Sequence, residues 1–127
     1  MVWRIPSRKV LSAVEEKDFP DVWITFVRGF NRLKNDRGLL RVLRKQSRIL
    51  NNLVARKYKA LHESELKTAV AAVSADLQFI DEKLRFIDEK LETTPFLAFR
   101  RLKSELSKMI KQTQANIKLV YDVRAVA

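Results

Sequence analysis

Between residues 66 and 91 the chain carries apolar residues at alternating steps of four and three, without interruption. This spacing places the apolar side chains on one side of an α-helix, and its length of nearly four heptads is typical of a coiled-coil seam. A strand is excluded, because side chains there alternate with a period of two. The residues of this heptad seam are Leu66, Val70, Val73, Leu77, Ile80, Leu84, Ile87 and Leu91.

The remainder of the chain also favours helices, because its 127 residues include only two glycines and three prolines. Sheet proteins need turn residues about every eight to twelve positions, which this composition cannot supply. The apolar fraction of 46% is sufficient for a hydrophobic core. We therefore predict one all-α domain over residues 1–127, a helical bundle of four to five helices with a long coiled-coil-like central helix or hairpin.

Local signals predict where the first helices begin and end. We expect a short helix over about 7–17 and an aromatic helix over about 22–35, with Asp21 as its N-cap. Gly38 fits a C-cap that ends this helix, and the next helical pattern starts at Leu39. The aromatic helix directs its large residues to one face: Trp23, Phe26, Val27, Phe30 and Leu33.

The segment from residue 39 to residue 92 permits two interpretations. A tight corner at 62–65, with Ser64 as a cap, gives two helices, whereas one continuous helix is the alternative. Thr94 as N-cap and Pro95 at the first helical position predict the start of a last helix that runs to about residue 124. Its expected inward residues are Phe99, Leu102, Leu106, Met109 and Val120.

The net charge of +11 is distributed unevenly along the chain. Residues 28–59 hold eleven basic groups and one acid, whereas residues 63–92 hold four basic and eight acidic groups. Residues 93–127 are basic again, with seven basic groups and two acids. A solvated helix face normally mixes both signs of charge, so the basic segments indicate a polyanionic partner.

The basic residues of residues 37–59 recur at three- and four-residue steps, which places them on one helix face about 33 Å long. A sparser stripe follows on the last helix. Arginine matches phosphate oxygens well, so these faces predict contact with an RNA or DNA backbone. The candidate nucleic-acid-binding residues are Arg37, Arg41, Arg44, Lys45, Arg48, Arg56, Lys59, Arg101, Lys108 and Lys111.

The basic faces also allow two alternatives to nucleic-acid binding. In one the faces are merely solvated, and in the other the protein is a coiled-coil adaptor for an acidic protein or an anionic membrane. The membrane is the less favoured partner, because the apolar side of the third helix is needed by the bundle. In size and charge pattern, but in no motif, the chain resembles the small helical subunits of RNA-guided CRISPR effectors. That resemblance implies one subunit of a larger nucleoprotein complex.

One spacing suggests an enzyme instead. Arg56 precedes the single histidine, His62, by six positions. This pair resembles the signature of HEPN-type ribonucleases, which are small helical domains that act as dimers. The resemblance implies that Arg56 steadies the scissile phosphate and that His62 transfers a proton. In that family the motif opens a late helix and a polar residue follows the arginine, whereas Lys57 follows it here and His62 lies near an expected helix end.

Several classes of function are disfavoured by what the sequence lacks. There is no cysteine, and the sequence holds no glycine-rich nucleotide motif or convergent metal ligands. We therefore expect a non-enzymatic protein without cofactor or metal. No apolar run approaches the ~20 residues of a membrane span. We expect a cytoplasmic location, with a mitochondrial presequence in residues 1–14 as the alternative.

A second apolar stripe accompanies the heptad seam. Residues 79–84 recur at 86–91, so that Phe79 and Phe86 lie seven positions apart and off the seam. One stripe can be filled within the bundle, and the other then needs a further helix or another subunit. We expect a homo-oligomer or a larger assembly through the Leu66–Leu91 heptads and Phe79/Phe86, with an intramolecular core as the alternative.

Overall fold

The computed structural model describes residues 19–34, 36–62, 64–90 and 96–121. These residues form four helices and no strand, which confirms the predicted all-α bundle. The helices are α2 (Phe19–Asn31), α3 (Arg37–Ala60), α4 (Ser64–Lys90) and α5 (Phe96–Lys118). The expected helix over 7–17, Leu91 of the seam, the capping pair Thr94 and Pro95 and the end near residue 124 lie outside the described residues.

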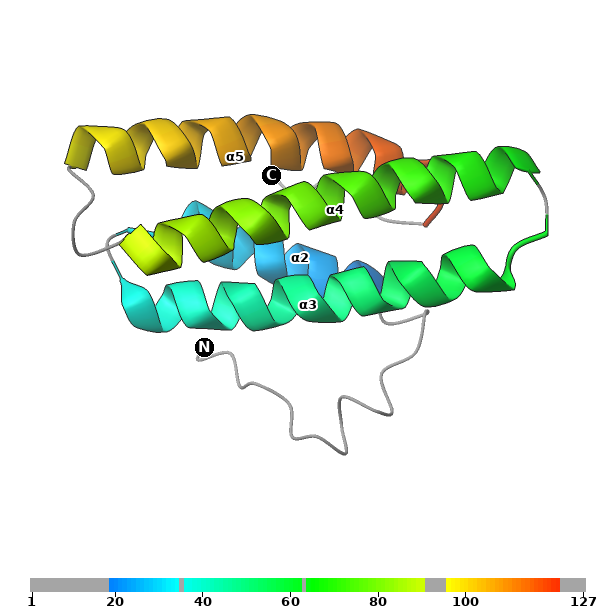
Figure 1. The fold of residues 1–127 in the computed structure, drawn as a ribbon, viewed down its shortest axis with the longest axis horizontal. Coiled ribbons are helices and arrows are strands. Elements are labelled where there is room, and N and C mark those ends of the chain that lie inside the picture. Colours follow the sequence, from blue (N-terminus) through cyan, green and yellow to red (C-terminus); the bar gives the residue numbers. More distant parts are fainter. Residues whose placement is uncertain (1–18, 35, 63, 91–95, 122–127) are drawn as a thin grey trace.

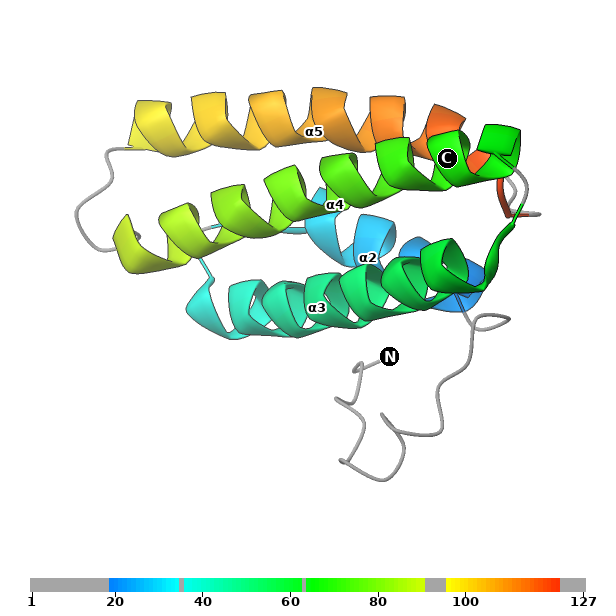
Figure 2. The ribbon, with the colours of Figure 1, turned by 45° about the vertical axis from the view of Figure 1, so that its right-hand side comes forward.

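The helices follow one another up and down the long axis of the bundle (Figure 1). Helix α4 lies between α3 and α5, and α2 lies behind it, on the opposite side of the core (Figures 1 and 2). The main helix contacts are α2 with α3, α3 with α4, and α4 with α5. Helices α3 and α5 therefore flank α4 on two different sides of the bundle.

Helix α2 begins three residues earlier than predicted and ends four residues earlier. It starts at Phe19, so Asp21 lies in the first turn and is not the N-cap. Pro20 is tolerated there because the first turn leaves its N–H groups without helical partners. At the other end, the N–H of Leu33 donates to the carbonyl of Phe30, a short turn that leads the chain away from the helix.

Helix α3 begins with a cap that the sequence interpretation assigned differently. The Asp36 carboxylate accepts a hydrogen bond from the N–H of Leu39 at 3.2 Å, so Asp36 is the N-cap. Gly38 lies in the first turn of α3 and has no positive φ, so its expected role as a C-cap is wrong. A short acidic side chain with extended backbone satisfies the first orphan N–H groups better than a glycine.

The alternative of one long helix over residues 39–92 is also wrong. Helix α3 ends at Ala60, and Leu61 takes an extended backbone with φ −85° and ψ 140°. Helix α4 begins at Ser64, which confirms the predicted corner. The side chain of Ser64 lies outside the described part of the structure, so its capping role stays a prediction.

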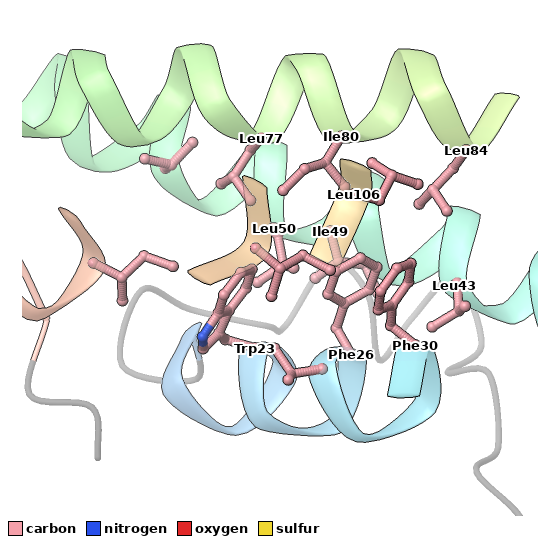
Figure 3. Packing of buried hydrophobic residues seen from close by; sticks show 14 of the residues in the cluster. Trp23, Phe26, Phe30, Leu43, Ile49, Leu50, Leu77, Ile80, Leu84 and Leu106 are labelled. Carbon is pink, nitrogen blue, oxygen red and sulfur yellow. The ribbon is translucent and has the colours of Figure 1, made fainter. Parts of the chain in front are cut away.

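The heptad seam of α4 faces the core of its own chain. Its buried members are Val70, Val73, Leu77, Ile80, Leu84 and Ile87. They lie opposite the large side chains of α2, among which Trp23, Phe26 and Phe30 are nearly inaccessible (Figure 3). Helix α2 approaches α3 closely at Gly29, where an added Cβ would lie 3.1 Å from Leu43 Cδ2. The seam is thus filled within one bundle, without a second subunit.

Helix α5 closes the core from the far side of α4. Phe99 and Leu106 are buried as expected, whereas Leu102, Met109 and Val120 are only partly buried. The sequence interpretation left out the buried residues Ile110, Thr113 and Ile117 of the same face. Near the end of the helix the Phe19 and Tyr121 rings stack with centroids 4.1 Å apart.

Candidate nucleic-acid interface

The basic residues of α3 lie on the face that turns away from the core. This helix has no acidic residue among its 24 positions. Helical spacing separates the two kinds of side chain, because Leu40, Leu43, Leu50 and Leu53 occupy the opposite side and are buried. Five of the predicted residues are exposed: Arg41, Lys45, Arg48, Arg56 and Lys59. We call this set the α3 basic face.

Two predicted members are placed differently from the rest. Arg37 and Arg44 are half-buried. The Arg44 guanidinium donates through Nη1 to Oδ2 of Asp88 on α4. The side chains of this pair are 22% and 14% exposed, so the charges are largely withdrawn from solvent. Arg44 is therefore an interhelical partner at the edge of the basic face.

A line of polar contacts continues from this pair along the α3–α4 boundary. The Ser47 hydroxyl donates to Asp81 at 3.2 Å, and the Asn51 amide donates to the carbonyl of Leu77 at 3.3 Å. Asp81 also accepts from Arg85 at 3.2 Å, which confirms that expected i,i+4 pair. The expectation that Asp81 and Asp88 are exposed is wrong, because both are half-buried against α3.

The amino-terminal half of α3 carries an open depression of about 290 Å³. Basic groups dominate its rim, and Gly38 and Val42 supply the small and apolar parts of its lining. The sequence interpretation missed these two residues, since neither has a charge or a hydrogen-bonding side chain. The basic lining residues are Arg41, Arg44, Lys45 and Arg48. Four of the ten predicted binding residues thus share one concave surface.

The predicted stripe on α5 does not join the α3 basic face. Arg101, Lys108 and Lys111 are exposed on α5. Because α4 lies between α3 and α5, the outer faces of these two helices point to different sides (Figures 1 and 2). Gln114, expected in the same stripe, instead accepts a hydrogen bond from the Trp23 indole N–H at the edge of the core. The ten predicted residues therefore form two separate surfaces.

The Arg56–His62 pair lies at the other end of α3 from the depression. Arg56 is exposed near the end of the helix, and His62 is exposed in the connection to α4. Exposed positions do not give a reacting phosphate the water-excluded, concave surroundings that are usual for active sites. Within the described segments, no group of three or more His, Asp and Glu side chains is placed to hold a metal ion.

Lys103 is a basic residue of α5 that has a structural role. Its Nζ donates to the carbonyl of Leu33 and, at 3.5 Å, to that of Asn31, beyond and at the end of α2. Burial, and then the nearby charge of Lys34, lower the pKa of Lys103 below its usual value. A cation at a helix C-terminus interacts favourably with the unpaired carbonyls there, so Lys103 joins α5 to α2.

Comparison of the chain with models of protein families, with curated proteins and with solved structures finds no match. Among the described residues, no helix combines the length and the apolar character needed to cross a membrane.

Proposed function

We propose that this protein binds the phosphate backbone of a nucleic acid along the α3 basic face, without selecting a base sequence. The observation that carries the proposal is the cluster of Arg41, Lys45 and Arg48 around one depression. All three side chains are exposed on a helix that has no acidic residue.

The chemistry of this cluster suits phosphate. Two of the three groups are guanidinium groups, which can donate two parallel hydrogen bonds to phosphate oxygens. Successive members lie about one helical turn apart, near 5.4 Å along the axis, so they form a row and not a point. A row of cations suits an extended polyanion better than a single small anion. No base-recognition motif accompanies the row, so backbone charge supplies the affinity.

The location of the cluster supports the same proposal. The apolar side of α3 is occupied by the core, which leaves no amphipathic face to insert into a lipid surface. The Arg44–Asp88 pair at its edge and the core behind it hold α3 in place, so the cations are presented from a fixed helix. Presentation from a rigid element lowers the entropy lost on binding.

The test uses two variants with equal changes of charge. Arg41→Glu/Lys45→Glu/Arg48→Glu alters the α3 basic face, and Arg101→Glu/Lys108→Glu/Lys111→Glu alters α5. Each changes the formal net charge from +11 to +5, and all six side chains are exposed. Arg44 is left intact, because a glutamate there would face Asp88 and disturb the fold.

Fluorescence anisotropy with labelled single-stranded RNA, duplex RNA and duplex DNA measures the dissociation constants. We expect the α3 variant to bind at least about 100-fold more weakly, because three charge-assisted contacts are replaced by repulsion. The α5 variant should lose about tenfold or less. Equal losses in the two variants would contradict the proposal, as would binding to anionic vesicles in the absence of any polynucleotide binding. Circular dichroism checks that both variants keep their helices.

A further inference from the structure

The outer face of α4 differs in character from the outer faces of α3 and α5. With the heptad seam turned inward, the opposite side of α4 points away from α2 and the core (Figures 1 and 2). Phe79 and Phe86 are 39% and 46% exposed on this side, at positions where charged residues are usual. Exposed Ala72 and Ala75 and the acid Glu82 accompany them. We call this set the α4 outer face.

We propose that the α4 outer face binds the same face of a second copy of this chain, with the two α4 helices antiparallel. Charge decides which surfaces of two identical, strongly basic molecules can meet. Helix α3 holds eight basic residues and no acid, and α5 holds six basic residues and one acid. Helix α4 holds four basic residues and six acids, so it is the described helix at which like-charged copies repel least.

The order of residues along this face favours the antiparallel register. A two-fold axis that passes between Glu82 and Lys83 brings Phe79 beside the partner's Phe86. The same operation brings Glu82 beside the partner's Lys83, and by symmetry each pair forms twice. In a parallel pair Glu82 would oppose Glu82 of the partner subunit, and the like charges would repel. Lys83 also lies 5.4 Å from the centre of the Phe79 ring, so its ammonium group is already at this surface.

The antiparallel arrangement has a consequence for the α3 basic face, and this consequence rests on the proposed function. The two-fold axis lies in the interface and runs across the α4 helices. Rotation about it leaves the α3 side of the bundle on the same edge of the dimer. Both α3 basic faces then lie on one edge, and both α5 helices lie on the other. A dimer of this kind presents two backbone-binding rows to one polyanion.

Sedimentation equilibrium on nucleic-acid-free, full-length protein tests the dimer without reference to nucleic-acid binding. We expect the mass to rise with concentration from 14.9 kDa towards twice that value. Phe79→Ala/Phe86→Ala should weaken association about tenfold or more, because central aromatic residues carry most of an interface's affinity. Leu97→Ala/Leu119→Ala is the matched control, since these leucines are 75% and 69% exposed outside α4 and should not affect the mass.

The register is tested by charge exchange and by cross-linking. Glu82→Lys and Lys83→Glu should each weaken the dimer, and the double variant Glu82→Lys/Lys83→Glu should restore it. Because the chain has no cysteine, Ala75→Cys mixed with Lys90→Cys should give a disulfide-linked heterodimer, whereas either variant alone should not. A monomer at every concentration would overturn the proposal and leave this face to a different partner. A double variant that stays as weak as the single ones would overturn the antiparallel register.

Discussion

Arg44 of α3 donates to Asp88 of α4, so one member of the most basic helix is paired with the most acidic one. The contact joins residues 44 positions apart in the chain. It sets the register of the antiparallel α3–α4 pair together with the Ser47–Asp81 contact. It also removes one arginine from the α3 basic face and fixes the position of those that remain.

A double-mutant cycle measures this pair. We expect Arg44→Met and Asp88→Asn each to lower the free energy of unfolding, and the coupling between them to be about 1–2 kcal/mol, since both side chains are largely shielded from solvent. Urea denaturation of the four proteins provides the values. The Asp81–Arg85 pair is the control, because its arginine side chain is 54% exposed and its coupling should stay below about 0.5 kcal/mol. Equal couplings in the two cycles would contradict the structural role of Arg44.

Salt dependence reports how many cations of the α3 basic face contact phosphate. Five exposed residues form that face. If each neutralises one phosphate of a duplex, log K should fall with log salt with a slope of about −4.5. In Arg41→Glu/Lys45→Glu/Arg48→Glu the slope should fall in magnitude to about −2, because only Arg56 and Lys59 remain. Anisotropy titrations at four salt concentrations give both slopes, and a slope unchanged by the substitutions would place the contacts elsewhere.

Lys103 should make stability depend on alkaline pH. Its pKa in the folded protein lies below the unfolded value of 10.5, so the folded state loses the proton first. The unfolded state then binds more protons between the two pKa values, and stability rises with pH across that interval. Below the lowered pKa and above 10.5, this residue should contribute no slope.

Lys103→Met isolates this effect from the other lysines. At neutral pH we expect the variant to be less stable by about 1 kcal/mol, because the carbonyls of Leu33 and Asn31 lose their donor. The difference in stability between the wild type and the variant should then increase as the pH rises towards 10.5. Urea denaturation of both proteins from pH 7 to 10.5 measures it. A difference that shrinks with pH would mean that the charged form is the one stabilised.

Periodicity within single helices was enough to predict the architecture. Val70, Leu77 and Leu84 recur at heptad spacing, and all three are buried. Polar residues at helix ends were harder to interpret, since Asp21 and Asp36 each precede or enter a helix and only the folded backbone distinguishes a cap from a first-turn residue. Gly38 was misplaced for the same reason, because a glycine fits both the end of one helix and the start of another.

The candidate site was predicted in part. The spacing of Arg41, Lys45 and Arg48 on one face follows from helix geometry alone, and the structure places them together. The partner of Arg44 could not be found in this way, because a pattern within α3 does not tell which neighbouring helix supplies a carboxylate. A signal did exist, since Asp81 and Asp88 both border the heptad seam of α4. The separation of the α3 and α5 stripes also depends on packing between helices that are distant in sequence.

The contact between Trp23 and Gln114 joins α2, the first of the described helices, to α5, the last. Together with the α2–α3, α3–α4 and α4–α5 contacts it makes the bundle a closed ring, in which every helix has two neighbours. Opening the chain at the α3–α4 connection would leave two helical hairpins, each with an uncovered apolar side that only the other fits. Such halves are suited to reassembly when they are produced as separate polypeptides.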